Sequence, residues 1–363
     1  MTDATGDALP LVVVGVGRIG LYHARHVQEL GRELGLCELV GVVDGYGDTA
    51  ERVARQLQEG QEKEIRAFGS VADLLGAGLA EGGAVVASRS EDHESDARAM
   101  VDAGWRVLLE KPLTDSLESA EELAAYLNND ESRSRALMLA FMRRFDAALI
   151  HAREMLAERI GRIFKIVSIL EDSHPPPEGY QSPGLLTDMA VHNADEIIWL
   201  TGRDPVAVTG TGARLYNQKI SSVREEIDDA FVQLWLADDA IGQIQVSRNH
   251  VAGYRNETCI YGEEGMIRVG HFQEDPLKVQ FEAYGRGVLI ERRSFWLRDY
   301  GDGVPVFIQR FGPAYKAEVA HFAEQCRDHG PFCVDQNDGL RAMRVVAAGT
   351  ESLRMAGDAR SIA

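Results

Sequence analysis

The feature that most constrains this chain is a glycine pattern close to its start. Residues 11–20, LVVVGVGRIG, place Gly-x-Gly-x-x-Gly between a short apolar run and an amphipathic stretch. Between a strand and a helix, such glycines permit a tight turn, let the backbone approach a pyrophosphate, and let the helix pack close to the sheet. An ordinary tight turn could use the same glycines, and Arg18 could simply lie on the surface. The context favours a dinucleotide-binding loop with the cofactor contacts Gly15, Gly17, Arg18 and Ile19.

An acidic residue ends the next apolar run. Residues 38–43 are followed by Asp44, which lies 24 positions after Gly20. A carboxylate at this place accepts hydrogen bonds from the adenosine ribose hydroxyls and repels a 2′-phosphate. Residues 45–47, Gly-Tyr-Gly, include no Lys or Arg that would hold such a phosphate. Asp44 therefore favours NAD over NADP, unless it is only a solvated strand end.

The first third of the chain alternates short apolar runs with helical patterns. The runs span residues 11–16, 38–43, 66–68, 84–87, 106–109 and 136–140. Runs that are apolar on both faces suit strands covered by helices on both sides, and their alternation with helices predicts βαβ units. We therefore predict an α/β domain with a doubly wound parallel sheet over residues 1–140.

The pattern changes after about residue 145. It predicts a helix (147–158), a strand (163–170), a second helix (186–200), a strand-rich stretch (206–290) and two final helices (313–328 and 337–355). Short strands joined by tight turns are typical of an antiparallel sheet. Residues 141–363 are therefore expected to form an α+β domain.

Charge and composition exclude several partners. The 363 residues carry 38 basic and 57 acidic side chains, a formal net charge of −19. Nucleic-acid binding needs clustered Lys and Arg, and an acidic membrane surface would repel this chain, so neither partner is expected. The four cysteines are scattered, the histidines are dispersed, and the first ten residues lack the basic region of a secretory signal. We expect a cytoplasmic protein without a metal site.

A second candidate motif is Glu110-Lys111-Pro112, which directly follows the run 106–109. Proline lacks an amide donor and favours extended geometry at the preceding residue, so the chain should turn here. The turn would present Lys111 at the carboxyl edge of the parallel sheet, where ligands bind in such folds. Its ammonium could hold an alcohol oxygen and stabilise developing negative charge. A lysine at a strand end can also be merely solvated.

Asp188 and His192 lie four positions apart in the helical pattern 186–200. At this spacing they share one helix face and can form a hydrogen bond. The carboxylate could fix the imidazole tautomer and leave the other nitrogen as a general base at neutral pH. An ordinary Asp–His pair on a helix surface would show the same spacing.

In this order, the motifs resemble the Gfo/Idh/MocA family of oxidoreductases, which are related to glucose–fructose oxidoreductase and inositol dehydrogenase. The resemblance covers nearly the whole chain and rests on residues 15–20 (GVGRIG), 110–113 (EKPL), 142–146 (MRRFD), Asp188-x-x-x-His192 and 338–343 (DGLRAM). It implies an N-terminal Rossmann domain that binds NAD. It also implies a second domain with a large, open, mostly antiparallel sheet, through which homodimers or homotetramers form.

The resemblance further implies hydride transfer between a polyol or sugar carbon and a nicotinamide. Carried over by motif, Lys111 would contact the reacting hydroxyl and His192 would be the general acid/base. Asp188 would orient His192 and bind substrate. Ser88 would face the cofactor, and Glu110 would line the nicotinamide side.

Within the family, inositol dehydrogenases look most similar, because residues 172–180 (DSHPPPEGY) resemble the loop ahead of their catalytic helix. By this resemblance, Arg143, Asp172 and Tyr254 are candidate substrate contacts. The alternatives are a surface arginine, a solvated loop acid and a strand aromatic.

Four residues depart from the pattern of the inositol group. Glu171 stands where arginine is usual, Ser173 and Arg89 each replace a proline, and Asn193 replaces an aspartate. Glu171 and Ser173 both adjoin the expected substrate loop. These departures put the identity of the substrate in doubt, but not the redox chemistry.

We therefore predict an NAD-dependent dehydrogenase that oxidises a hydroxyl carbon of an inositol-like cyclic polyol. The alternative in the same fold is a dehydrogenase or reductase of an aldose or ketosugar. The alternative of another class is a non-catalytic regulator that binds nucleotide and sugar. The joint presence of Lys111, Asp188 and His192 argues against the regulator, because a sensor needs no general base.

Overall fold

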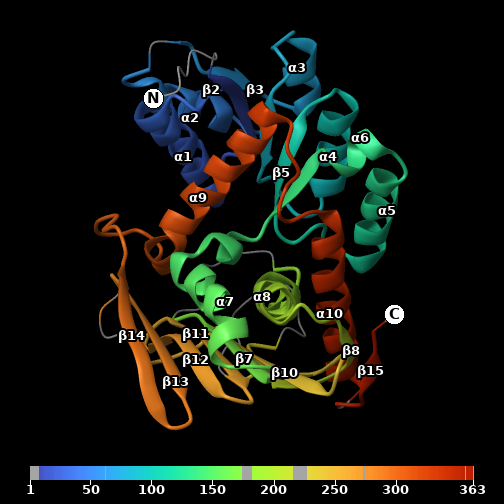
Figure 1. The fold of residues 1–363 in the computed structure, drawn as a ribbon. Helices are drawn as coiled ribbons and strands as arrows, with labels where there is room; N and C mark the ends of the chain where they lie inside the picture. Colours follow the sequence, from blue (N-terminus) through green and yellow to red (C-terminus); the bar gives the residue numbers. More distant parts are fainter. Residues whose placement is uncertain are drawn as a thin grey trace. The chain divides into compact units, whose positions relative to one another are not determined.

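The computed structural model describes residues 8–61, 63–173, 182–215, 227–272, 275, 277–355 and 357–362. The chain divides into two compact units (Figure 1). Residues 1–141 and 315–340 form the first unit, and residues 142–314 and 341–363 form the second. None of the described helices is both long and apolar enough to cross a membrane.

Six parallel strands form the sheet of the first unit. They are β1 (Leu9–Val14), β2 (Cys37–Val43), β3 (Arg66–Phe68), β4 (Gly83–Val86), β5 (Arg106–Glu110) and β6 (Leu137–Ala140). Their order is β3-β2-β1-β4-β5-β6, with every neighbouring pair parallel. This is the order of a doubly wound sheet, in which ligands bind at the carboxyl ends near the switch between β1 and β4. The predicted parallel sheet is confirmed.

Helices alternate with these strands. They are α1 (Arg18–Leu34), α2 (Thr49–Gln58), α3 (Val71–Gly76), α4 (His93–Asp102), α5 (Leu117–Asn128) and α6 (Glu131–Ser134). Serine side chains begin two of them: the hydroxyl of Ser70 accepts the Asp73 N–H, and that of Ser116 accepts the Ser119 N–H. Each of these bonds satisfies a donor that the first helical turn leaves without a partner. The strand residues 11–13 are fully buried, as expected for a sheet covered on both faces.

The end of the chain returns to the first unit. The chain leaves this unit between Phe141 and Met142, close to the predicted boundary, but residues 315–340 belong to it as well. That segment joins parts of α9 (Val306–Asp328) and α10 (Gln336–Arg354). Apolar packing accounts for the return, because Phe322 fills the space that a side chain on Gly83 would need. The sequence pattern alone predicts one second domain over residues 141–363, which would include residues 315–340.

A nine-stranded sheet forms the second unit. Its strands are β7 (Ile163–Glu171), β8 (Pro205–Ala213), β9 (Asp229–Leu236), β10 (Ala240–Ser247), β11 (Arg255–Gly262), β12 (Gly265–Phe272), β13 (Lys278–Gly285), β14 (Val288–Trp296) and β15 (Arg360–Ser361). Their order is β14-β13-β12-β11-β7-β10-β9-β8-β15. The β7–β10 pair is parallel and the other neighbours are antiparallel. The prediction of a large, mostly antiparallel sheet is confirmed.

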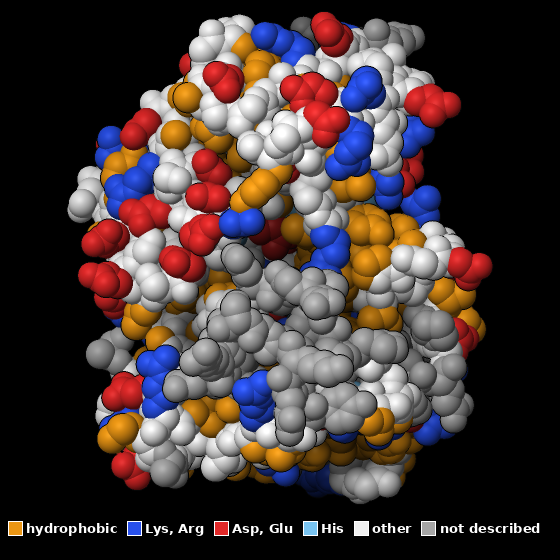
Figure 2. All heavy atoms as spheres, turned by 180° about the vertical axis from the view of Figure 1, so that it is seen from behind, with side chains coloured by type: hydrophobic (Ala, Val, Ile, Leu, Met, Phe, Trp, Pro, Cys, Tyr) orange, Lys and Arg blue, Asp and Glu red, His pale blue; other side chains and the backbone are white. Residues whose placement is uncertain are grey.

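The helices of the second unit lie on one face of this sheet. They are α7 (Ala147–Arg159), α8 (Val191–Thr201) and the second half of α10, and Figure 1 shows them on the same side of β7 to β10. Alternation along the strands turns Phe231, Trp235 and Ile241 to the other face, where each is between 38% and 49% exposed. Figure 2 shows hydrophobic side chains along the lower edge of the view, where Figure 1 has strands of this sheet. This outer face is open among the described residues.

Candidate active site

The glycine loop after β1 has the geometry that its sequence predicts. Gly15 has φ +79°, and a Cβ there would lie 2.5 Å from the Ser88 nitrogen. A Cβ on Gly20 would meet the carbonyl oxygen of Gly15 at 1.8 Å, so both positions require glycine. Gly17 precedes α1, and nothing lies within 4 Å of its ideal Cβ. The loop therefore leaves open space at the residue where backbone would approach a pyrophosphate.

Asp44 lies directly beside this loop. Its Oδ2 accepts the Val16 N–H at 3.1 Å, and its Oδ1 accepts the Tyr46 N–H at 3.0 Å. The carboxylate is half-buried, so it remains accessible to a ligand. Asp44 and the glycine loop are thus brought together by the parallel pairing of β1 with β2.

The loop after β4 adjoins the same region. Ser88 lies against Gly15, and its hydroxyl donates to Asp96 at 2.7 Å. Burial raises the pKa of Asp96. Arg89, which replaces a proline of the inositol-group pattern, has its guanidinium 4.7 Å from the ring centroid of Tyr46 and forms an ion pair with Glu91. Its side chain therefore extends toward the loop that carries Asp44.

Glu110 and Lys111 lie at the carboxyl end of β5, as predicted, and Lys111 is half-buried. Glu110 is buried, accepts the Lys111 N–H at 3.1 Å, and pairs with Nε2 of His23 at 2.7 Å. His23, on α1, is fully buried, and no motif pointed to it. His23 thus binds one carboxylate oxygen of Glu110 from within the first unit.

A buried histidine joins the two loops that carry Ser88 and Lys111. Nδ1 of His93 lies 2.9 Å from the Pro112 carbonyl oxygen, and Nε2 lies 3.2 Å from the Ser88 carbonyl oxygen. Burial outweighs these two acceptors and lowers the pKa of His93, so the ring is neutral at pH 7. The histidine links the cofactor loop to the turn at Lys111-Pro112.

In the second unit, Asp188 and His192 lie at the junction of two helical types. Residues 186–190 form a single π-helical turn, and α8 begins at Val191. Such turns are rare and frequently occur at functional sites. His192 is buried, and Asp188 is half-buried. Asp188 forms an ion pair with Arg248 at 3.1 Å, a contact that the i, i+4 spacing did not indicate.

Arg143 is not a surface residue. It is 1% exposed, and its Nη1 donates to Glu196 of α8 at 2.8 Å. Oε1 of Glu196 also accepts the hydroxyls of Ser168 and Thr258. The sequence motif indicated a substrate contact at Arg143, but it gave no sign of the buried carboxylate that pairs with it.

Tyr254 is also buried, and it lies among charges of the second unit. Burial raises the pKa of Tyr254 strongly, and the nearby carboxylate of Asp172 raises it further. The phenol therefore keeps its proton at neutral pH. Arg143 and Arg310 act on the same hydroxyl in the opposite direction. The structure thus brings Arg143, Asp172 and Tyr254 into one neighbourhood.

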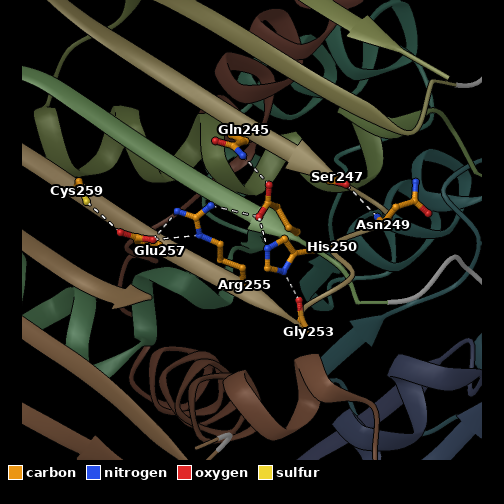
Figure 3. Close-up of polar contacts among 9 residues, drawn as sticks. Gln245, Ser247, Asn249, His250, Gly253, Arg255, Glu257 and Cys259 are labelled. Atoms are coloured by element: carbon orange, nitrogen blue, oxygen red, sulfur yellow. Dashed lines mark hydrogen bonds and ion pairs between the residues drawn. The ribbon is translucent and has the colours of Figure 1, made fainter. Parts of the chain in front are cut away.

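Glu171 lies on the other side of β7 from the helices. Ser168 faces α8, and strand alternation turns Glu171, three residues later, to the opposite face. There it accepts Gln245 Nε2 at 2.6 Å and pairs with Arg255 and His250, which Figure 3 draws around one carboxylate. This unusual residue is therefore part of the sheet's outer face. Pro175, Pro176, Pro177 and Tyr180, quoted for the resemblance, lie outside the described residues.

Matches with known families cover both units. Residues 9–137 match the oxidoreductase family with an NAD-binding Rossmann fold, and residues 149–268 match the GFO/IDH/MocA C-terminal domain. The chain belongs to the Gfo/Idh/MocA family. The predicted family, the oxidoreductase class and the NAD cofactor are thereby confirmed.

Relatives cover nearly the same length. The chain is 30% identical over 318 residues to myo-inositol dehydrogenase Hyg17 of Streptomyces leeuwenhoekii, which covers 86% of this chain and 87% of that protein. It is 28% identical over 345 residues to scyllo-inositol 2-dehydrogenase (NAD(+)) of Bacillus subtilis, covering 94% and 93%. The crystal structure of a myo-inositol dehydrogenase from Corynebacterium glutamicum superposes with a TM-score of 0.79 at 25% identity, covering 98% and 99%.

The residues of the first unit fit the cofactor of this family. The open space at Gly17 suits the pyrophosphate, and the N-terminus of the helix that begins after it is the end that favours an anion. The accessible Asp44 suits the ribose hydroxyls of NAD. In the described part of the chain, no group of three or more His, Cys, Asp or Glu side chains could hold a metal ion.

Proposed function

We propose that this enzyme oxidises one ring hydroxyl of an inositol-like cyclic polyol to a ketone. The pair formed by the half-buried Asp188 and the buried His192 carries the proposal, because the imidazole of His192 offers an acceptor for the hydroxyl proton. The two relatives described above by sequence are named inositol dehydrogenases. A polyol also suits the buried polar groups of the second unit, Arg143 and Tyr254, since each offers hydrogen-bond donors.

His192 would take the proton of the reacting hydroxyl while the hydride leaves the same carbon. NAD+, when bound, accepts that hydride at its nicotinamide ring. Asp188, ionised by its pairing with Arg248, would stabilise the imidazolium that His192 becomes. In the reverse direction His192 would return the proton to the alkoxide oxygen.

Lys111 would hold the oxygen from which the proton departs. Its ammonium would stabilise negative charge on that oxygen as it develops. Glu110 and His23 hold the turn that carries Lys111 from within the first unit, and His93 holds Pro112. Gly15, Gly17, Arg18, Ile19, Asp44 and Ser88 would complete the cofactor contacts.

A sugar dehydrogenase is the second candidate. Asn193, fully buried directly after His192, donates to Ser168 where the inositol-group pattern has aspartate. This change lies beside the proposed acid/base, so it can alter which ring the site accepts.

The test is NADH absorbance after mixing the purified protein and NAD+ with myo-, scyllo- and chiro-inositol, and then with common aldoses. Inositol turnover supports the proposal. Turnover of aldoses alone supports the second candidate. If NAD+ binds and no polyol or sugar is turned over, the proposed oxidation is contradicted, and a regulator that binds nucleotide and sugar becomes the better explanation.

We also propose that the outer face of the nine-stranded sheet packs against a second copy of the chain. Phe231, Trp235 and Ile241 expose apolar surface there on adjacent strands, with Ile241 paired to Trp235 in the register. Burial of this surface would stabilise a dimer. Light scattering should give a dimer or tetramer, and Trp235→Glu should lower the oligomer's mass. A monomeric parent protein would contradict the proposal.

The compartment is proposed to be the cytoplasm. None of the four cysteines forms a disulfide bond, and three of them are buried. Burial raises the pKa of the Cys37 thiol to about 12, which makes it an inert structural thiol. Cell fractionation tests this assignment.

A further inference from the structure

Arg248 lies in the loop between β10 and β11 and is 2% exposed. Its Nη2 donates to Oδ2 of Asp188 at 3.1 Å and to the hydroxyl of Ser182 at 2.8 Å. None of the motifs assigned a role to this arginine. A buried guanidinium is therefore in direct contact with the carboxylate that is proposed to orient His192.

The backbone on both sides of Arg248 is fixed. The Arg248 N–H donates to the carbonyl of Asp228, directly before β9, at 2.9 Å. The Asp172 N–H donates to the Ser247 carbonyl, and the His250 N–H donates to the Asp172 carbonyl, both at 2.8 Å. The loop is thus bound to the end of β7 and to β9.

The side chain of His250 fixes the same loop on the outer face of the sheet. Figure 3 shows its ring beside the Gly253 carbonyl, which lies 2.5 Å from Nδ1. The Glu171 carboxylate lies 3.6 Å from Nε2. Glu171 is held in turn by Gln245 and Arg255. Since the loop is held at both faces, Arg248 is presented to Asp188 from a rigid backbone.

Asp188 needs such a partner because it lies on the π-helical turn. The turn interrupts the regular i, i+4 geometry that would by itself direct Asp188 at His192. The neighbouring acids of α8 are engaged elsewhere: Asp195 pairs with Arg144, and Glu196 pairs with Arg143.

We propose that Arg248 is a positioning residue for the oxidation, holding the Asp188 carboxylate ionised and in one orientation. This inference rests on the proposed function of Asp188 and His192. An arginine that donates to a carboxylate makes a short, directional, charge-assisted bond, which lysine reproduces only as a point charge.

Charge and geometry have separate consequences. The Arg248 cation disfavours protonation of its neighbours, so its removal raises the apparent pKa of the Asp188–His192 pair. Because His192 acts as a base, the rising limb of kcat/KM against pH then moves to higher pH. Asp172 with Tyr254, and Glu171 with His250 and Arg255, are the other titratable groups of this region, and they are unchanged in the variant.

The experiment compares Arg248→Met, Arg248→Lys and a control with the parent enzyme, using the polyol that the parent oxidises. Arg248→Met should lower kcat by on the order of 100-fold. It should also move the rising limb up by about one pH unit. Arg248→Lys should leave the limb in place and lower kcat by about tenfold, because it keeps charge but not geometry. The Kd for NAD+ should change in neither variant.

The control is Arg162→Met. Arg162 donates two N–H groups to the carboxylate of Glu263, and both of these side chains are about half exposed. This variant should have parental kcat and pH profile. It separates the effect of Arg248 from the loss of any arginine–carboxylate pair in the second unit.

A double-mutant cycle shows whether Arg248 acts through Asp188. Once Asp188→Asn has removed the charge, adding Arg248→Lys should cost less than about twofold, since interacting residues are non-additive. Full additivity would overturn the proposal, as would an Arg248→Lys enzyme with parental kcat. Thermal melting shows whether Arg248→Met folds. If it does not, the activity of Arg248→Lys and the double-mutant cycle decide whether Arg248 positions Asp188. If the parent enzyme itself oxidises no polyol, the proposed function has failed before Arg248 is tested.

Discussion

The two halves of the proposed active site are built differently. In the first unit, the cofactor half uses the backbone: two glycines make room, and main-chain N–H groups hold Asp44. In the second unit, the substrate half uses charged side chains in buried pairs. Arg143 reaches Glu196 across 53 residues of sequence, and Arg248 reaches Asp188 across 60.

This difference determines how each half should respond to mutation. A backbone-built site depends on the size of one or two residues, so a methyl group suffices to damage it. A site of paired charges depends on both partners, because removal of one leaves the other buried and uncompensated. Loss of cofactor binding should therefore follow small changes in the glycine loop, and loss of stability should follow the removal of one partner from a buried pair.

The largest effect is expected for His192→Asn, with Lys111→Met as its counterpart in the first unit. Removal of the general base should lower kcat by at least about 100-fold. Removal of the electrostatic stabiliser should have an effect of about the same size. Fluorescence titration should show that both variants still bind NADH. Full activity in either variant would contradict its role in the mechanism.

Arg143→Met should destabilise the second unit by about 3–5 kcal/mol, because Glu196 remains buried without its cation. Arg162→Met, which breaks the exposed pair with Glu263, should cost less than about 1 kcal/mol. Chemical denaturation measures both. If the two variants lose the same free energy of unfolding, the buried pair contributes no more to stability than the exposed pair does.

Two glycine substitutions separate strain from ligand contact in the first unit. Gly17→Ala should leave the melting temperature unchanged and weaken NAD+ binding by about 1–3 kcal/mol, since its Cβ meets only open space in the protein. Gly15→Ala should also lower stability by about 1–3 kcal/mol, because of its positive φ and the backbone of Ser88. Calorimetry of binding and melting of the two proteins gives the comparison. A destabilised Gly17→Ala would show that the loop is not open there.

The smallest effect is expected for Asp44→Ala. Loss of this hydrogen-bond acceptor should weaken the binding of NAD+ by about tenfold. Loss of the negative charge of Asp44 should let the site accept the 2′-phosphate of NADP+ more readily. The ratio of kcat/KM for NADP+ to that for NAD+ should therefore rise. An unchanged ratio would remove the selectivity role of Asp44.

Most of the cofactor half could be predicted from sequence, because its signals are local. The Gly15–Gly20 pattern, the acid at the end of β2 and the turn at Lys111-Pro112 each lie within a few residues of a strand end. Parallel pairing then brings those ends together without further information. What the sequence did not reveal here are the contacts of Glu110 with His23 and of Arg89 with Tyr46, which depend on side chains from separate elements.

The substrate half was predictable only as a set of residues. Spacing indicated Asp188 with His192, and resemblance indicated Arg143, Asp172 and Tyr254. Neither showed that Arg143 is buried against Glu196, nor that Arg248 holds Asp188. The π-helical turn was also missed, because residues 186–200 read as one regular helix. Glu171, which adjoins the expected substrate loop in sequence, faces the outer side of the sheet.

The sequence by itself determined the parallel sheet and the glycine loop after β1, since these follow from periodicity and from residues that are close along the chain. Only the tertiary structure decided which charges neutralise one another in the second unit and which face of the sheet each occupies. It also decided that residues 315–340 belong to the first unit. The physical reason is that a buried charge selects its partner by proximity in space, and that proximity is created only when distant strands and helices pack.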